Sequence, residues 1–246
     1  MVRIVATLGR CVVKNPAAGG GRWVDVPPER LVSWIVTFTH RHGAGPISGD
    51  TAGAAVTFEA ADGAVAECHP PFPPVPWAGA GDPAAVAEAI VAHAVADRTV
   101  GVLLVRLGGY AAGVFTGSPP GLVSSKTGSR PVHGRSAAGG WSQHRFARRR
   151  ENQASTALRA AAEAAVAIFG PHRLDDLVLG GDKRSITGIR GDPRLAPYLA
   201  LATDRFLTVP DPRLAVLKEI PRSFLAIRIR LTDQEPVRPP SADQVN

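Results

Sequence analysis

The order of apolar segments in the second part of this 246-residue chain restricts its fold more than any other property. Thr99–Leu107 is a nearly all-apolar run of strand length, and Gly108 and Gly109 join it to a second such run as a hairpin turn would. Strands are predicted at 99–107, 110–116, 174–179, 206–209 and 223–231, and helices at 142–169 and 195–201. This alternation predicts an α/β fold, with a mixed β-sheet and helices on its faces.

The first 97 residues predict a smaller α+β lobe. Its predicted elements are a strand at 22–26, a helix that opens at Pro27-Pro28, a hairpin formed by 54–59 and 63–68, and a helix after Asp82. His40 and His42 have the spacing of a metal-binding pair, but no third ligand is near in sequence and a surface pair is favoured. We therefore expect an N-terminal lobe at 1–97, a second domain at 98–232 and a flexible tail at 233–246.

The positive charge is concentrated in one segment. The formal net charge is +7, and the segment from Lys126 to Glu151 holds seven Lys and Arg side chains and one acid, so it carries +6 of that charge. More than half of this segment falls in a Gly-, Ser- and Pro-rich stretch, 117–141, and that composition predicts a long loop. A basic segment on a nearly neutral body is the electrostatic footprint of polyphosphate binding, and a solvated basic face is the alternative.

Common catalytic motifs do not fit the chain. The segment 121–127 has Ser125 where a P-loop requires glycine, and Tyr110 replaces the second glycine of a dinucleotide-binding turn. There is no GxSxG elbow and no Cys/His set with metal-ligand spacing. The sequence therefore predicts neither a cofactor nor a metal site.

One segment carries a specific resemblance. Residues 133–151 read HGRSAAGGWSQHRFARRRE. This closely resembles the catalytic loop of eukaryotic and archaeal class I peptide release factors, where HGR and GGQ precede a helix that begins RFARxRxE. Here three residues separate HGR from the two glycines, and the glutamine comes two positions later. That spacing resembles the Vms-type release-factor-like proteins of ribosome quality control, and the resemblance covers about 98–232.

The resemblance implies the release-factor middle domain, which is related in topology to RNase H-like folds. It implies a peptidyl-tRNA hydrolase that frees nascent chains on stalled or split ribosomes, with the large ribosomal subunit and the CCA end of peptidyl-tRNA as partners. Because a chain of this length has no room for the stop-codon-reading and C-terminal partner-binding domains, we do not expect stop-codon termination.

The predicted catalytic residues are Gln143, Gly139 and Gly140. The amide of Gln143 does not titrate, so it is not a base, but it can hold a water by donating and accepting hydrogen bonds. Two glycines keep the loop thin where it approaches an ester deep in RNA. Predicted RNA-binding residues are Lys126, Arg130, His133, Arg135, Trp141, His144, Arg145, Arg148, Arg149 and Arg150. Trp141 either stacks on a terminal base or packs internally. Arg145, Arg148 and Arg149 either contact phosphates or pair with Glu151 or Asp182. His133 and Arg135 either contact RNA or brace the loop.

Two other functions stay open at this point. One is an endonuclease that removes the tRNA 3′ CCA end, with the 2′-OH attacking the adjacent phosphate and arginines stabilising the charge. The other is a non-catalytic tRNA- or ribosome-binding rescue factor, since a fold alone does not confer hydrolysis.

The sequence shows no signal peptide, no membrane span and no CxxC pair around Cys11 or Cys68, so we expect a cytoplasmic protein with neither membrane nor DNA as a partner.

Overall fold

The computed structural model describes residues 15–17, 20–76, 79, 81–106, 108–129 and 142–232. The chain forms two compact units, each built on one sheet. The first unit comprises Met1–Pro70, Pro74–Val91 and Ala226–Asn246, and the second comprises Pro71–Pro73 and Ala92–Leu225. Mixed α/β architecture is therefore confirmed.

The sheet of the first unit is antiparallel, in the order β1-β2-β11-β5-β4-β3. The elements of this unit are β1 (Asn15–Pro16), β2 (Arg22–Val26), α1 (Pro28–His42), β3 (Ala44–Gly49), β4 (Val56–Ala60), β5 (Val65–His69) and β11 (Ile227–Thr232). Helix α2 (Pro83–Ala94) begins in this unit, and its last three residues belong to the second. The strand at 22–26, both helices and the β4–β5 hairpin were predicted. Helix α1 buries Leu31, Ile35 and Phe38, which recur at helical spacing.

The last strand lies in a different unit from the one predicted. β11 pairs with β2 on one side and β5 on the other, with Ile229 opposite Val24 and Cys68. Its alternate residues Ile227, Ile229 and Leu231 are buried, so the strand fills the centre of the first sheet. The division of the chain therefore differs from the expected boundaries at 97 and 232, because the end of the chain returns to complete the first core.

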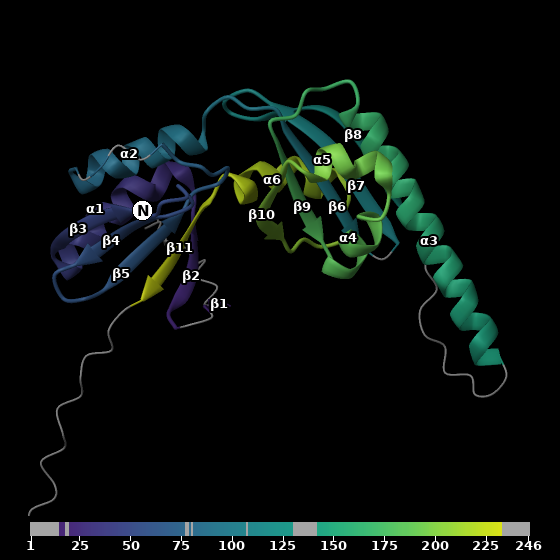
Figure 1. Cartoon of the computed structure of the whole chain (residues 1–246), viewed down its shortest axis with the longest axis horizontal. Helices are drawn as coiled ribbons and strands as arrows, with labels where there is room; N and C mark the ends of the chain where they lie inside the picture. Colours follow the sequence, from purple (N-terminus) through teal and green to yellow (C-terminus); the bar gives the residue numbers. More distant parts are fainter. Residues whose placement is uncertain are drawn as a thin grey trace, which may run out of the picture. The chain divides into compact units, whose positions relative to one another are not determined.

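The sheet of the second unit is mixed, in the order β10-β9-β6-β7-β8. Its elements are β6 (Val100–Arg106), β7 (Gly109–Thr116), β8 (Gly121–Ser129), α3 (Ser142–Phe169), β9 (Asp176–Gly181), α4 (Lys183–Ile189), a 3-10 turn η1 (Pro193–Leu195), α5 (Ala196–Leu199), β10 (Ala202–Leu207) and α6 (Leu214–Phe224). β6 is parallel to β9 and antiparallel to β7, which is antiparallel to β8. Consequently β6, β8 and β9 run in the same direction, and their carboxyl ends share one edge (Figure 1).

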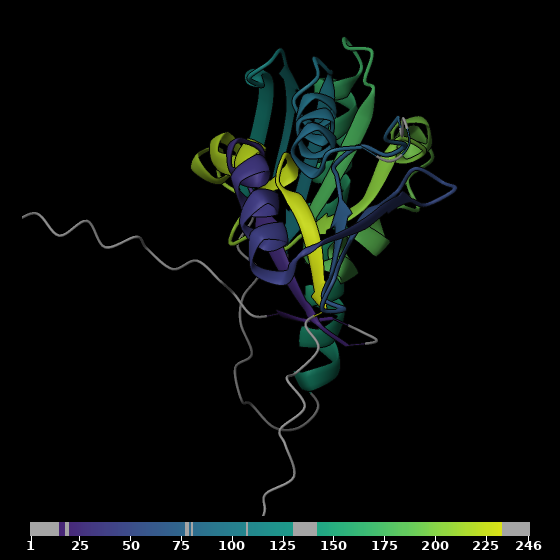
Figure 2. The same cartoon turned by 90° about the vertical axis from the view of Figure 1, so that its left-hand side faces the viewer.

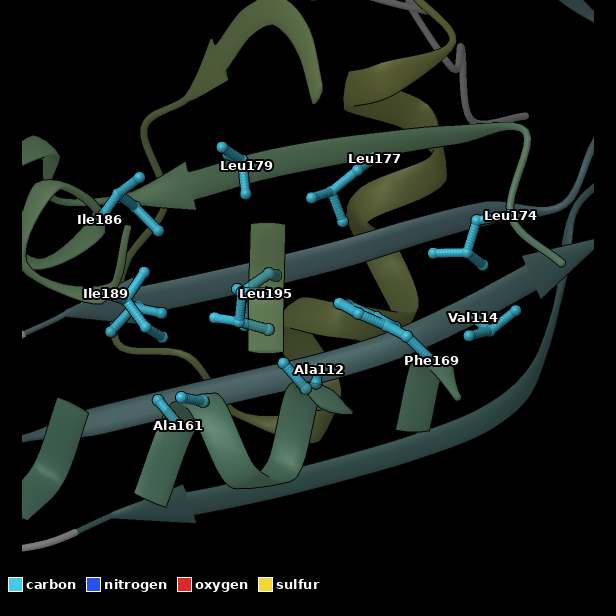
Figure 3. Packing of buried hydrophobic residues seen from close by; sticks show 14 residues of the cluster. Ala112, Val114, Ala161, Phe169, Leu174, Leu177, Leu179, Ile186, Ile189 and Leu195 are labelled. Carbon is cyan, nitrogen blue, oxygen red and sulfur yellow. The ribbon is translucent and has the colours of Figure 1, made fainter. Parts of the chain in front are cut away.

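Helices cover both faces of this sheet, as predicted. On one face, α3, α4 and η1 contribute to a core that contains Leu103, Leu177 and Phe169 (Figure 3). On the other face, α6 contributes Leu217, Ile220 and Phe224 to a second core. The strand β6 alternates between the two cores, with Leu103 in the first and Leu104 in the second. A strand buried on both sides reads as a continuous apolar run, which explains the sequence at 99–107.

The predicted loop at 117–141 is shorter than expected. Its middle forms β8, an edge strand that pairs with β7 from Thr116 opposite Gly121 to Gly109 opposite Ser129. Serine and glycine give this segment the composition of a loop, and pairing with β7 rather than intrinsic propensity makes it a strand. Among the helices in the described ranges, none is both long and apolar enough to cross a membrane.

Candidate functional site

The candidate site consists of the segment that joins β8 to α3 in the sequence and of the first turns of α3. β8 ends at Ser129 and α3 begins at Ser142, so the HGR and GG motifs belong to the segment that joins them. Lys126, near the end of β8, is exposed and lies opposite Ala112 of β7. The described structure therefore fixes both ends of the predicted loop.

Helix α3 is anchored by its carboxyl-terminal half. Ala161, Ala162, Ala165 and Phe169 are buried against the sheet, and alanine at these positions allows close approach of the helix. Phe169 also contacts the ring of Tyr198, with ring centroids 5.4 Å apart. Alanine has the highest helix propensity, so the Ala-rich sequence favours a long helix before any packing.

The amino-terminal half of α3 extends beyond the sheet (Figure 1, Figure 2). The helix has 28 residues, so at a rise of 1.5 Å per residue it is about 42 Å long. Gln143 is the second residue of α3, in the first turn, where backbone N–H groups lack helical partners. The candidate glutamine therefore belongs to the end of α3 that lies away from the core.

The charge at this end of α3 opposes the helix dipole. The first turn contains no acidic residue, whereas the dipole favours acids there and bases at the other end. Arg145, Arg148, Arg149 and Arg150 all lie within the first nine residues of the helix, from Ser142 to Arg150. This arrangement costs helix stability and produces a strongly positive helix end, as expected of a surface that binds anions.

The predicted site residues fall into three groups. Lys126 is described with its side chain. Gln143, His144, Arg145, Arg148, Arg149 and Arg150 are described as backbone of α3. The remaining predicted residues lie outside the described residues: Arg130, His133, Arg135, Gly139, Gly140 and Trp141. The catalytic and RNA-binding roles of all of these residues stay predictions.

Asp182 and His42, two residues that the sequence singled out, have defined partners. Asp182 caps α4, because its carboxylate accepts hydrogen bonds from the Ser185 N–H at 2.8 Å and the Ser185 hydroxyl at 2.7 Å. His42 Nδ1 lies 2.8 Å from the carboxylate of Asp62, whose pKa is lowered by a hydrogen bond from the Ala64 N–H and by His42. Across the residues with described positions, no group of three His, Cys, Asp or Glu side chains is arranged to hold a metal ion.

Sequence reasoning overlooked the basic residues of α4. Lys183 and Arg184 are the first two residues of α4, one residue after the strand β9, and Arg190 follows the last residue of the helix. All three are exposed and lie in the same unit as α3. Their position directly after a predicted strand, in the sequence Asp182-Lys183-Arg184, could have indicated them. The excess of positive charge at 126–151 is larger, so it hid this smaller group.

Comparison with known proteins gives a family for the chain, matched over most of the second unit and part of β11. Residues 98–230, more than half of the chain, match the family described as the Actinobacteria/chloroflexi VLRF1 release factor. No curated protein matches the chain.

Among solved structures, an archaeal translation termination factor, aRF1, has 14% sequence identity and a TM-score of 0.37 over 82% of this chain. An archaeal protein has 15% identity and a TM-score of 0.31 over 80% of it. This chain spans 66% and 62% of the lengths of those two structures. The match of residues 98–230 confirms the resemblance seen in 133–151, and the chain belongs to the Actinobacteria/chloroflexi VLRF1 release factor family.

Proposed function

We propose that the protein is a peptidyl-tRNA hydrolase that releases nascent chains from tRNA on stalled or split ribosomes. The observation that carries this proposal is the position of Gln143 in the first turn of α3, three residues after Gly140 and within the region that matches the family. A release factor acts on an ester between peptide and tRNA, so the reaction is acyl transfer to water.

The proposed mechanism depends on positioning. The side chain of Gln143 holds the attacking water, because an amide both donates and accepts hydrogen bonds. A backbone N–H next to it stabilises the negative charge that develops on the ester carbonyl oxygen, as in an oxyanion hole. The bond between the acyl carbon and the 3′-oxygen of the tRNA breaks, and the proton from the water goes to that 3′-oxygen, relayed by the ribosomal site or by the terminal 2′-OH. Gly139 and Gly140 leave room for the ester to approach the backbone.

RNA binding is assigned to the cations around the loop. Lys126, Arg145, Arg148 and Arg149, together with Arg130, Arg135 and Arg150, neutralise phosphates, and His133, His144 and Trp141 add polar and stacking contacts. Support comes from α3, because Arg145, Arg148 and Arg149 lie in its first turns, at the positive end of the helix dipole. The arrangement predicts binding that weakens steeply as salt concentration rises.

The test uses labelled peptidyl-tRNA on isolated large subunits, with the released tRNA resolved by length. Wild type should release the peptide and leave full-length tRNA. Gln143→Ala should lower the release rate about 10²–10³-fold, the usual effect of removing one positioning interaction. Gln153→Ala is the matched control, because it makes the same change on the same helix outside the motif.

Two other outcomes would replace the proposal. A tRNA shortened at its 3′ end would favour the endonuclease, for which the concentration of arginines beside the glutamine is the supporting feature. Retained binding without release, or a Gln143→Ala variant as active as wild type, would favour the non-catalytic rescue factor. In that case, replacing Arg145, Arg148 and Arg149 by alanine should abolish function while Gln143→Ala leaves it intact.

A further inference from the structure

Helix α4 presents its basic side chains to solvent because its other face is in the core. Ile186 and Ile189 are buried with α3 residues in the same core, and Ser185 is held by Asp182. Lys183 and Arg184, in the first turn, and Arg190, just after the last residue of the helix, are exposed. Burial of the apolar face therefore fixes the direction in which these three cations point.

These cations lie at the edge of the sheet where β8 also ends. β8 and β9 run in the same direction, so the chain leaves β8 toward the loop and leaves β9 toward α4 at one edge. Figure 1 shows α4 at the end of the sheet beyond which the amino-terminal half of α3 extends. α4 also contacts α3 directly, because a Cβ added to Gly188 would lie 2.7 Å from Leu158 Cδ1.

The three charges of α4 are available to a ligand. Within the part of the chain that the structure describes, no hydrogen bond or ion pair engages the side chains of Lys183, Arg184 or Arg190. The neighbouring Arg194 is different, since its guanidinium binds Asp192 with N–O distances of 3.0 and 2.7 Å. Lys183 and Arg184 also occupy the first turn of α4, where the helix dipole disfavours cations. Their placement is thus not explained by the stability of α4.

The distance between α4 and Gln143 indicates the size of the ligand. Leu158, at the contact with α4, is fifteen residues from Gln143 on α3, which corresponds to about 22 Å of helix. A nucleic-acid strand places a phosphate about every 3.4 Å along its axis, so this distance corresponds to about six phosphates. A small anion cannot reach both places, whereas an RNA chain can.

We propose that Lys183, Arg184 and Arg190 bind the phosphate backbone of the tRNA acceptor arm while its 3′ end lies at Gln143. This inference rests on the proposed function, which places the 3′ end of tRNA at the start of α3. The acceptor arm is favoured over ribosomal RNA because it is covalently continuous with that 3′ end. The α4 surface then contributes affinity and orientation, whereas Gln143 contributes to the chemical step.

The test replaces the three α4 cations together by glutamine (Lys183→Gln, Arg184→Gln, Arg190→Gln) in the full chain. The matched control makes the same loss of charge on α6, on the opposite face of the same sheet, with Arg213→Gln, Lys218→Gln and Arg222→Gln. All six side chains are exposed, so both variants should fold. Binding of fluorescently labelled deacylated tRNA is measured by anisotropy between about 50 and 200 mM salt, with isolated large subunits as a second ligand.

The α4 variant should bind tRNA more weakly and should lower the slope of log K against log salt by about two to three, roughly 0.9 for each phosphate that the protein no longer neutralises. In the release assay it should raise KM and leave kcat unchanged. The α6 variant should match wild type in both assays. The inference is overturned if the α4 variant binds tRNA as wild type does, if the α6 variant loses as much affinity, or if only large-subunit binding falls. Failure of the proposed function is a separate result, because wild type would then bind tRNA through α4 without releasing peptide.

Discussion

Gly181 shows how one residue fixes the geometry where β9 turns toward α4. Its φ is +110°, and a Cβ at this position would collide with the carbonyl oxygen of Val105. That oxygen also accepts the Asp182 N–H at 2.9 Å, so the two strands cannot separate without losing a hydrogen bond. We therefore expect Gly181→Ala to lower the free energy of unfolding of the second unit by at least about 2 kcal/mol.

Amide hydrogen exchange in β6 and β9 measures this loss. The control is Gly121→Ala at the start of β8, where a Cβ would lie 3.8 Å from the Thr116 carbonyl oxygen. The control should leave exchange in these strands almost unchanged. Equal effects of the two substitutions would contradict a special role for Gly181.

The Asp192–Arg194 ion pair predicts that the stability of the fold depends on the protonation of the Asp192 carboxyl. Hydrogen bonds from the Arg194 side chain hold the pKa of the Asp192 carboxyl below its ordinary value of 3.8. Because the pKa is lower in the folded chain, the pair stabilises the fold above that ordinary value, and the contribution is lost as pH falls through the lowered pKa. Arg194→Gln should return the Asp192 pKa toward 3.8, as followed by carboxyl NMR. An unchanged Asp192 titration in the variant would show that other groups hold the charge.

At the scale of elements, the packing of α3 predicts a difference between two neighbouring alanines. Ala165 is fully buried against the sheet, whereas Ala167 on the same helix is exposed. Ala165→Leu should destabilise the second unit by about 1–3 kcal/mol, because a close-packed core has no space for three more carbon atoms. Ala167→Leu should change stability by less than about 0.5 kcal/mol. Hydrogen exchange in β7, which packs against α3, distinguishes the two results, and similar protection in both variants would mean that α3 is not anchored through Ala165.

The apolar pattern of the sequence predicted some elements of the second unit, but it did not predict β8 or α6. The helix at 142–169 and the hairpin of β6 and β7 carry clear apolar patterns, and both are present as predicted. β8 was missed because serine and glycine have low strand propensity, and its partner β7 determines its conformation. α6 was missed because Pro221 lies inside the helix, where proline normally ends one.

The candidate site was predicted by motif rather than by physical pattern. Gly139, Gly140 and Gln143 have no periodicity and no burial signal, so only the resemblance of 133–151 singled them out. The structure adds what no motif contains, namely that α3 is anchored at its far end and that α4 lies at the edge of the sheet where β8 ends. The position of the basic residues of α4 could not be predicted from the local sequence, because it depends on the direction in which β9 runs in the sheet.

At the scale of the whole molecule, the chain exchanges segments between its two units. Phe72 lies among residues of the first unit in sequence, but its ring packs in the second unit against Phe224, with centroids 6.0 Å apart. Its carbonyl oxygen lies 2.8 Å from His93 Nε2, and the Arg98 guanidinium lies 5.1 Å from the ring centroid. Conversely, Ile229 follows the second unit in sequence and is fully buried in the first.

This exchange predicts a crossed pattern of destabilisation. Phe72→Ala should cost the second unit about 3–5 kcal/mol, and Ile229→Ala should cost the first unit about 2–5 kcal/mol, because each leaves a cavity in a core. Hydrogen exchange read separately in β6 and β7 and in β4 and β5 assigns each loss to a unit. A chain divided simply at residue 97 would give the reverse assignment, with Phe72→Ala weakening β4 and β5 and Ile229→Ala weakening β6 and β7. Since the two substitutions act on separate cores, the double variant should show both losses added within about 0.5 kcal/mol, and a larger deviation would show that the two positions are energetically coupled.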